Sequence, residues 1–327
     1  YKKVILKNSN ITNFCQISLK GNIHLILKNY HYLKKFYQQL KIYVICPSKE
    51  LHFFKEALSY EEIEVIDENE LISKNKFTEI FLEYSKNINY SFEFRKRLNW
   101  YYQQVLKISF AIDFIKKKKQ SIVIWDADTI LIKKINFFKD NHSIQYGTFN
   151  EFHKQYYMTN KNILKSLPKY HLSFLVQFAS ITPNELSFLE KKLFNEINYN
   201  KKTMPLKISE IILSSIFNKH KEFNGSMFSE FELIGQSTCL LKNTKQRPIL
   251  TLRFGLDGQL NKYQITLIRI LNFKHITYEH THINKKSYGM LNRNQTWFGL
   301  VKLIIKNLLR FYLRSFKHNY MYKKFYE

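Results

Sequence analysis

The stretch Ser121-Ile-Val-Ile-Trp-Asp-Ala-Asp-Thr-Ile-Leu-Ile132 decides the fold of this chain. Four apolar residues lead directly into Asp126 and Asp128, and three more apolar residues follow after Thr129. A short apolar run rich in β-branched residues is typical of a strand buried on both faces of a parallel sheet. The stretch therefore predicts an α/β protein whose central strand ends in two acids.

The two acids stand where open α/β sheets bind their ligands, at the carboxyl end of a strand. Carboxylates there are unfavourable unless a cation pairs with them, and a divalent metal that holds a diphosphate is the simplest such cation. A second interpretation stays open, because acids at a strand end also cap the turn that follows. Asp126 and Asp128 are thus predicted to hold a metal–phosphate group or to cap a turn.

Strand and helix patterns alternate before this stretch. Short strands are predicted over 14–19, 41–47 and 62–67, and helices over 23–40 and 48–58 lie between them. This order favours a parallel sheet with crossover helices. The remaining elements are predicted as a long amphipathic helix over 97–114, strands over 143–150, 174–181 and 276–282, and helices from Pro183, over 208–217 and over 228–235.

Length and composition indicate a well-packed basic protein. The chain has 327 residues, of which 45% are hydrophobic, enough for one large α/β domain with additions. Its net charge of +26 favours polyanionic partners, which include nucleic acid, an anionic membrane surface and nucleotide-sugar phosphates. The three cysteines, Cys15, Cys46 and Cys239, form no Cys-x-x-Cys pair, so neither a disulfide framework nor a zinc site is expected. This cysteine usage favours a reducing cytoplasm.

Three motifs together resemble a known family. They are Trp100-Tyr-Tyr-Gln-Gln-Val-Leu-Lys107, Trp125-Asp-Ala-Asp-Thr129 and Phe228-Ser-Glu-Phe-Glu-Leu-Ile-Gly235. The combination resembles bacterial glycosyltransferases of the GT-A fold with a DxD motif, of the kind encoded among capsule and lipopolysaccharide genes. Ile234 departs from that pattern, since the family has an aromatic residue there. The resemblance spans roughly residues 97 to 235 and leaves the later residues unmatched.

The resemblance implies a GT-A-like α/β domain with a central, mostly parallel sheet flanked by helices, which we expect over residues 1–296. It also implies a nucleotide-sugar donor, a divalent metal (Mn or Mg), and a capsule, lipopolysaccharide or lipid-linked saccharide as acceptor. Asp128 is the expected first metal ligand, while Asp126 reaches the ribose, the donor sugar or, through water, the metal. The metal would act as a Lewis acid on the leaving nucleoside diphosphate.

Further residues are expected around the donor. An inverting transfer needs a base for the acceptor hydroxyl, and Glu230 and Glu232 are the candidates, although acids at a helix start also suit the helix dipole. His280 and His282 alternate along a predicted strand, so both can face one side, either as late metal ligands or as structural residues. The side chains expected to contact the donor, unless they are simply part of the core or the surface, are those of Trp125, Gln104, Lys107 and Lys285.

The segment 297–327 differs in character from the rest of the chain. It combines apolar residues with a basic residue at about every fourth position and holds no acid before Glu327. This pattern is typical of a basic amphipathic helix at an anionic membrane surface, and the alternative is a terminal helix packed on the core with a solvated basic face. No apolar run is long enough for a transmembrane helix. We therefore expect a cytoplasmic enzyme that is peripheral on the inner face of the cytoplasmic membrane.

Proteins of other classes fit the sequence less well. The lysines are scattered, and no zinc finger, base-reading arginine stripe or RNA motif is present, so no nucleic-acid partner is expected. A metal-dependent nuclease would need further acids beside Asp126 and Asp128, and the absence of a Gly-rich phosphate loop excludes the P-loop and Rossmann fingerprints. A basic nucleic-acid-binding or membrane-surface protein without catalytic activity is the alternative.

Overall fold

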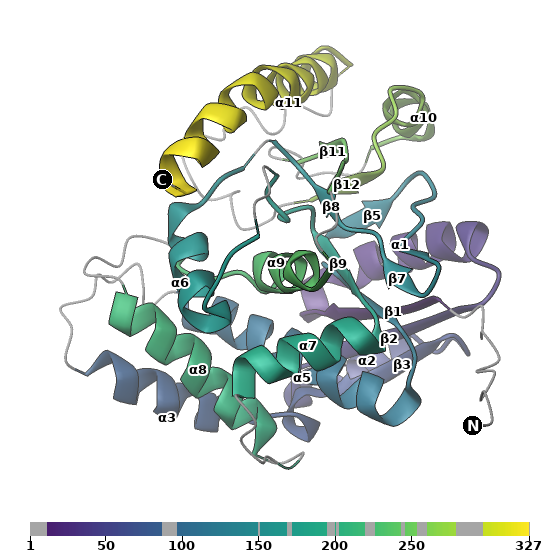
Figure 1. The fold of residues 1–327 in the computed structure, drawn as a ribbon. Helices are drawn as coiled ribbons and strands as arrows, with labels where there is room; N and C mark the ends of the chain where they lie inside the picture. Colours follow the sequence, from purple (N-terminus) through teal and green to yellow (C-terminus); the bar gives the residue numbers. More distant parts are fainter. Residues whose placement is uncertain are drawn as a thin grey trace, which may run out of the picture.

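A five-stranded sheet in the order β3-β2-β1-β4-β9 forms the centre of the protein (Figure 1). Its first four strands run parallel, and β9 runs antiparallel to β4. The strands are β1 (Thr12–Ile17), β2 (Leu40–Cys46), β3 (Ile63–Asp67), β4 (Ile122–Trp125) and β9 (Phe178–Ile181). This computed structural model describes residues 12–86, 97–149, 151–168, 172–194, 200, 203–219, 226–242, 246–253, 260–278 and 297–326, with side chains up to 315.

The order of the strands reverses at β1. Phe14 of β1 lies opposite Ile42 of β2 on one side and opposite Val123 of β4 on the other. The chain moves outward from β1 to β3 and then returns past β1 to form β4. In open α/β sheets the crevice at such a reversal, at the carboxyl ends of the strands, is where ligands bind. Here the reversal lies between β1 and β4, and Asp126 follows the carboxyl end of β4 directly.

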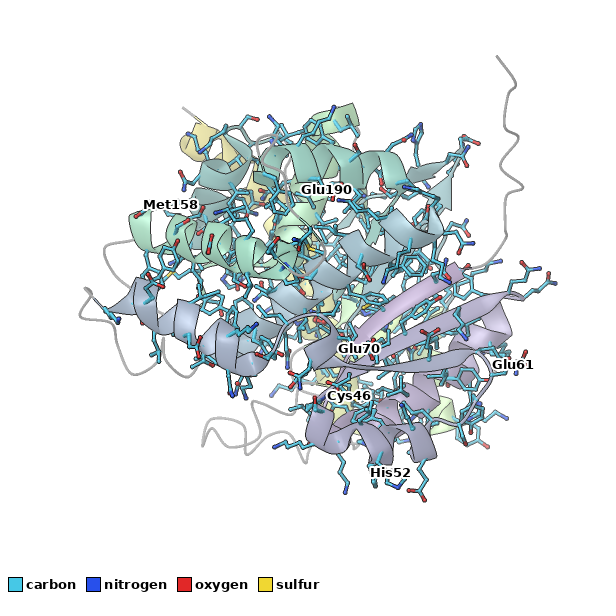
Figure 2. All side chains as sticks on the ribbon, turned by 90° about the horizontal axis from the view of Figure 1, so that it is seen from below. Cys46, His52, Glu61, Glu70, Met158 and Glu190 are labelled. Carbon is cyan, nitrogen blue, oxygen red and sulfur yellow. The ribbon has the colours of Figure 1, made fainter. Side chains whose placement is uncertain are left out.

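Helices cover both faces of the sheet, as the sequence predicts. Successive strand residues point to opposite faces, so Phe14 and Val123 pack with α1 and α2, while Cys15 and Ile124 pack with the helices of the other layer. Figure 2 shows His52 of α2 and Glu190 of α7 on opposite sides of the sheet. These helices are α1 (Ile23–Phe36), α2 (Leu51–Ala57), α3 (Lys74–Ser85), α5 (Leu98–Lys118), α6 (Lys154–Leu164), α7 (Pro183–Phe194), α8 (Met204–Lys219) and α9 (Glu230–Lys242).

A second, three-stranded sheet begins directly after Asp128. Its order is β11-β12-β5, and Ile276 of β12 lies opposite Ile130 of β5 in an antiparallel pair. A separate apolar core joins this sheet to Leu300 and Ile304 of the last helix, so that helix is packed into the fold. The elements of this part are β5 (Thr129–Leu131), β11 (Thr251–Leu252), α10 (Lys262–Ile270), β12 (His275–Thr277) and α11 (Trp297–Tyr326).

Several predicted boundaries differ from the structure. The strand predicted over 174–181 begins only at Phe178, because Gln177 has a φ of 63° and turns the chain before it. Ser48 does not cap α2, since its hydroxyl donates to Asp67 instead. Within the described ranges, no helix combines the length and the apolar character that crossing a membrane requires. The strand predicted over 143–150 is replaced by short pairings, namely β6 (Phe138–Lys139) with β7 (His142–Ser143) and β8 (Tyr146–Gly147) with β10 (Arg247–Pro248).

Candidate functional site

Helices α5 and α9 bring three charged side chains together at the carboxyl end of β4. Lys107 Nζ lies 2.5 Å from Asp126 Oδ1 and 2.5 Å from Glu230 Oε1. The backbone N–H of Glu230 donates to Gln104 Oε1 (3.0 Å), which fixes the start of α9 against α5. The Lys107 and Glu230 side chains are 8% and 4% exposed, whereas that of Asp126 is 23% exposed. Asp126 is therefore the solvent-facing end of a buried cluster.

The charges in this cluster do not cancel. Burial alone would lower the pKa of Lys107, but the carboxylates of Asp126 and Glu230 outweigh it and raise that pKa, so the ammonium form is held. Burial raises the pKa of Glu230, an effect that Lys107 opposes and Asp126 reinforces. Two acids share one ammonium, and Asp128 follows two residues after Asp126. The cluster thus sets two carboxylates around a single ammonium at the end of β4.

A second set of side chains orients Asp126 from the opposite side. Its backbone N–H donates to the carbonyl of Gln177 (3.0 Å). With the Gln177 amide oriented to suit both neighbours, Nε2 donates to Asp126 Oδ2 (2.6 Å) and Oε1 accepts from Arg253 Nε (3.1 Å). Arg253 in turn donates to Glu151, whose pKa burial would raise but the guanidinium lowers. Both carboxylate oxygens of Asp126 are therefore held, Oδ1 by Lys107 and Oδ2 by Gln177.

Asp128 is positioned by the second sheet. Its carbonyl accepts from the N–H of Tyr278 (2.8 Å), and its Oδ1 accepts from the Thr129 hydroxyl (3.3 Å). Trp125, which directly precedes Asp126 in the chain, is completely buried, and its ring stacks on that of Phe178 with 5.3 Å between the ring centroids. Its indole N–H donates to the Thr129 carbonyl (2.8 Å), so Trp125 supports the turn from within the core. A contact between Trp125 and a donor stays a prediction.

Glu232 lies in a different environment from Glu230. It is fully buried, its Oε1 accepts from the Ser173 hydroxyl and the Phe174 N–H (3.0 Å), and its Oε2 accepts from Gln236 (3.1 Å). The glycine of the same motif, Gly235, has a packing role, because a Cβ there would meet the ring of Phe174 at 2.1 Å. The start of α9 therefore holds the segment that leads to Gln177.

Burial raises the pKa of Glu232 to about 7, against the opposing hydrogen bond from Ser173. An acid whose pKa is raised on folding stabilises the protein at low pH, and this contribution is lost as the pH rises from about 4.5 to about 7. Between pH 5 and pH 8 the free energy of unfolding of the wild type should fall by about 2–3 kcal/mol relative to that of Glu232→Gln. Denaturant titrations of both proteins at each pH measure this difference, and parallel pH profiles would contradict the prediction.

Asp126 and Asp128 offer the oxygen ligands that Mg²⁺ and Mn²⁺ prefer, and a hydrogen-bonded carboxylate keeps further lone pairs for a metal. Their chemistry therefore fits a divalent ion. In the part of the chain that the structure describes, no three His, Cys, Asp or Glu side chains group closely enough to hold a metal. The other expected ligands, His280 and His282, and the expected donor contact Lys285 lie outside the described residues. A metal at this site stays a prediction.

The structure brings together Gln104, Lys107, Asp126 and Glu230, which come from three separate motifs of the sequence. Lys107 contacts two acids, where the sequence suggested a surface position or a donor contact. Gln177, Arg253 and Glu151 were not foreseen. The one feature of the sequence that could have indicated Arg253 is its position as a single charge directly after β11. No feature of the sequence could have indicated Gln177, because its role depends on a left-handed backbone.

These features define an α/β protein with a buried acid–lysine cluster at the reversal point of a mostly parallel sheet. Residues 22–214 match a family model described as "Family of unknown function (DUF6492)", and the chain belongs to this family. No curated protein matches the chain significantly.

The solved structures that are similar to the chain include the following two. Mouse xyloside xylosyltransferase 1 in its apo form has a TM-score of 0.41 and 11% identity, over 83% of this chain and 98% of that one. Galactosyltransferase LgtC, in complex with donor and acceptor sugar analogues, has a TM-score of 0.37 and 7% identity, over 86% and 93%. Because both TM-scores are low, the function proposed for this chain rests on its own residues.

Proposed function

We propose that the protein is a glycosyltransferase that moves a sugar from a nucleotide-sugar donor to a saccharide acceptor. The observation that carries this proposal is the place of Asp126 and Asp128, at the carboxyl end of β4 and beside the strand where the sheet order reverses. Ligands of open α/β sheets bind at such a point. Carboxylate oxygens are the ligands that Mg²⁺ and Mn²⁺ prefer, and such a cation in turn binds a diphosphate.

In this proposal two aspartates bind the metal, and the residues around them hold Asp126 in place. Asp128, with Asp126 beside it, would hold Mn²⁺ or Mg²⁺, and the ion would supply Lewis-acid stabilisation of the departing nucleoside diphosphate. Lys107 and Gln177 each hold one oxygen of Asp126, which keeps that carboxylate in a single orientation. A carboxylate held in place in this way does not have to be reoriented when the donor binds.

The acids of α9 differ in what they can do. A base must come within hydrogen-bond reach of the acceptor hydroxyl. Glu230 is buried, but it shares Lys107 with Asp126, the solvent-facing acid of the cluster, whereas Glu232 is held by Ser173, Phe174 and Gln236. We assign the base of an inverting transfer to Glu230 and a structural role to Glu232.

The acceptor that we propose is a capsule, lipopolysaccharide or lipid-linked saccharide, and the enzyme would act on the inner face of the cytoplasmic membrane. This proposal is based on the motifs at residues 100–107, 125–129 and 228–235 and on the basic C-terminal segment. A saccharide carried on a lipid reaches an enzyme at the membrane surface by diffusion in two dimensions.

Donor binding is the direct test of the proposed function. Thermal unfolding is measured with a panel of nucleoside diphosphate sugars, each with and without Mn²⁺. A ligand present at 100 times its Kd stabilises the folded state by about 2.7 kcal/mol, so the correct donor should raise the Tm by several degrees, and more so with the metal. A complete panel that leaves the Tm unchanged in the presence of Mn²⁺ would overturn the proposal.

Glu230→Gln tests the assignment of the base. The amide keeps the shape of the side chain but cannot take a proton, so turnover should fall by about 10²-fold or more while the donor-induced shift in Tm remains. Glu232→Gln, two positions further on the same helix, is the matched control and should keep its turnover. Equal losses in the two variants would remove Glu230 from the role of base.

A further inference from the structure

The last helix, α11, has three different lengthwise strips. The inner strip is buried and consists of Leu300, Leu303, Ile304, Asn307 and Phe311. Its first three residues pack in the core of the second sheet. An apolar row on the outside is 41–62% exposed and consists of Val301, Ile305, Leu309 and Leu313. A basic row lies next to it and consists of Lys302, Lys306, Arg310 and Arg314.

The two outer rows run side by side along the helix. Residues four positions apart in an α-helix form a continuous ridge, and the two rows are offset by one residue. The groove between them is lined by Ile305, Leu309 and Leu313 from the apolar row and by the whole basic row. The outer face of α11 therefore combines an apolar ridge with a positively charged ridge over its described side chains.

The neighbouring helix α10 also exposes apolar side chains. Tyr263 and Ile270 are seven positions apart, hence on one side of α10, and they are 76% and 73% exposed. The inner side of α10 is buried through Ile265 and Ile268, in the same core as α11. Figure 1 shows α10 and α11 at one end of the molecule, away from α2 and α3.

We propose that the outer rows of α11, together with Tyr263 and Ile270 of α10, bind the headgroup region of an anionic phospholipid bilayer. Apolar side chains enter the boundary between headgroups and acyl chains, while lysine and arginine pair with lipid phosphates. This inference deepens the proposed function, because it names the surface at which a lipid-linked acceptor meets the enzyme.

Charge decides against a second copy of the chain as the occupant. From Trp297 to Tyr326 the sequence contains no acid, so two facing copies of α11 would set basic rows against each other. An anionic bilayer instead has the opposite charge along the whole face. The overall charge of +26 adds a long-range attraction to the same surface.

The face is also connected to the candidate site through a shared core. Leu300, Leu303 and Ile304 of the buried strip pack in one core with Ile130 and Ile132, which follow Asp128 in the chain. Membrane binding through this face would therefore hold Asp128 at a defined height above the bilayer. Truncation at Trp297 is a poor test, because it would also expose this core; substitutions in the exposed rows leave the core intact.

The test is co-sedimentation of the full chain with vesicles of phosphatidylcholine that contain 30% phosphatidylglycerol, compared with pure phosphatidylcholine. The wild type should bind the anionic vesicles and lose that binding as salt is added. Lys302→Gln/Lys306→Gln should weaken it by about fivefold for each lysine, and Leu309→Ser/Leu313→Ser by about tenfold or more for each leucine. Lys49→Gln/Lys55→Gln, with Lys49 just before α2 and Lys55 within it, is the charge-matched control and should bind like the wild type.

The outcomes separate the possible occupants. Equal losses of vesicle binding in the Lys302/Lys306 variant and the Lys49/Lys55 variant would mean a general charge effect and would overturn the proposal. A wild type that stays in the supernatant would overturn it as well. A wild-type dimer that the leucine variant dissociates would assign the face to a second copy. None of these measurements uses turnover, so failure of the glycosyltransferase proposal would leave this test valid. Unchanged Tm values of the variants check that each is folded.

Discussion

Replacement of Lys107 by methionine should lower the free energy of unfolding by about 3–5 kcal/mol. The reason is that Asp126 and Glu230 both contact the Lys107 ammonium, so its removal leaves the buried Glu230 carboxylate and the partly exposed Asp126 carboxylate without their shared cation. Urea denaturation at pH 7 measures the change. Turnover should be lost as well, because Asp126 would no longer be held in its orientation.

A matched control lies on the same helix. Lys117 pairs with Asp113 at 2.6 Å on the surface of α5, with its side chain 52% exposed. Lys117→Met should change stability by no more than about 0.5 kcal/mol, because exposed ion pairs contribute little. The triple change Lys107→Met, Asp126→Asn, Glu230→Gln should regain much of the lost stability, since no charge is then left unpaired. A single Lys107→Met variant as stable as the wild type would show that the cluster does not bear on folding.

Asp128→Ala is expected to have the largest effect on activity, a loss of at least about 10²-fold in metal-dependent transfer. The side chain is only partly buried and the turn is also held through its backbone, so the fold should remain. Transfer is measured across a range of Mn²⁺ concentrations, together with the Tm. The expected pattern is a lost or strongly right-shifted metal dependence at a nearly unchanged Tm.

The control for this variant is Glu79→Ala, which removes one exposed acid from α3, on the other side of the protein from α11 (Figure 1). It should keep both its turnover and its metal dependence. Unchanged turnover in Asp128→Ala would remove the metal role from Asp128. A loss of turnover with a metal dependence like that of the wild type would assign Asp128 to donor contact instead.

The sequence was sufficient to predict the main sheet and its helical layers. The apolar run before Asp126 predicted a strand buried on both faces, and β4 has this character with all four residues buried. The alternation of strands and helices before it predicted the parallel order, because a crossover helix leaves few other arrangements. The C-terminal helix was also predicted, because its repeat of basic residues at every fourth position depends only on residues that are neighbours along one helix.

The pairing of Lys107 with Asp126 and Glu230 could not be predicted in this way. Lys107 and Glu230 are 123 positions apart, and only the packing of α5 against α9 at the end of β4 brings them together. The same is true of Arg253 and Gln177, whose bond depends on a backbone turn that no residue type announces. Periodicity reports which face of an element is buried; which charges meet across elements is decided by how those elements pack.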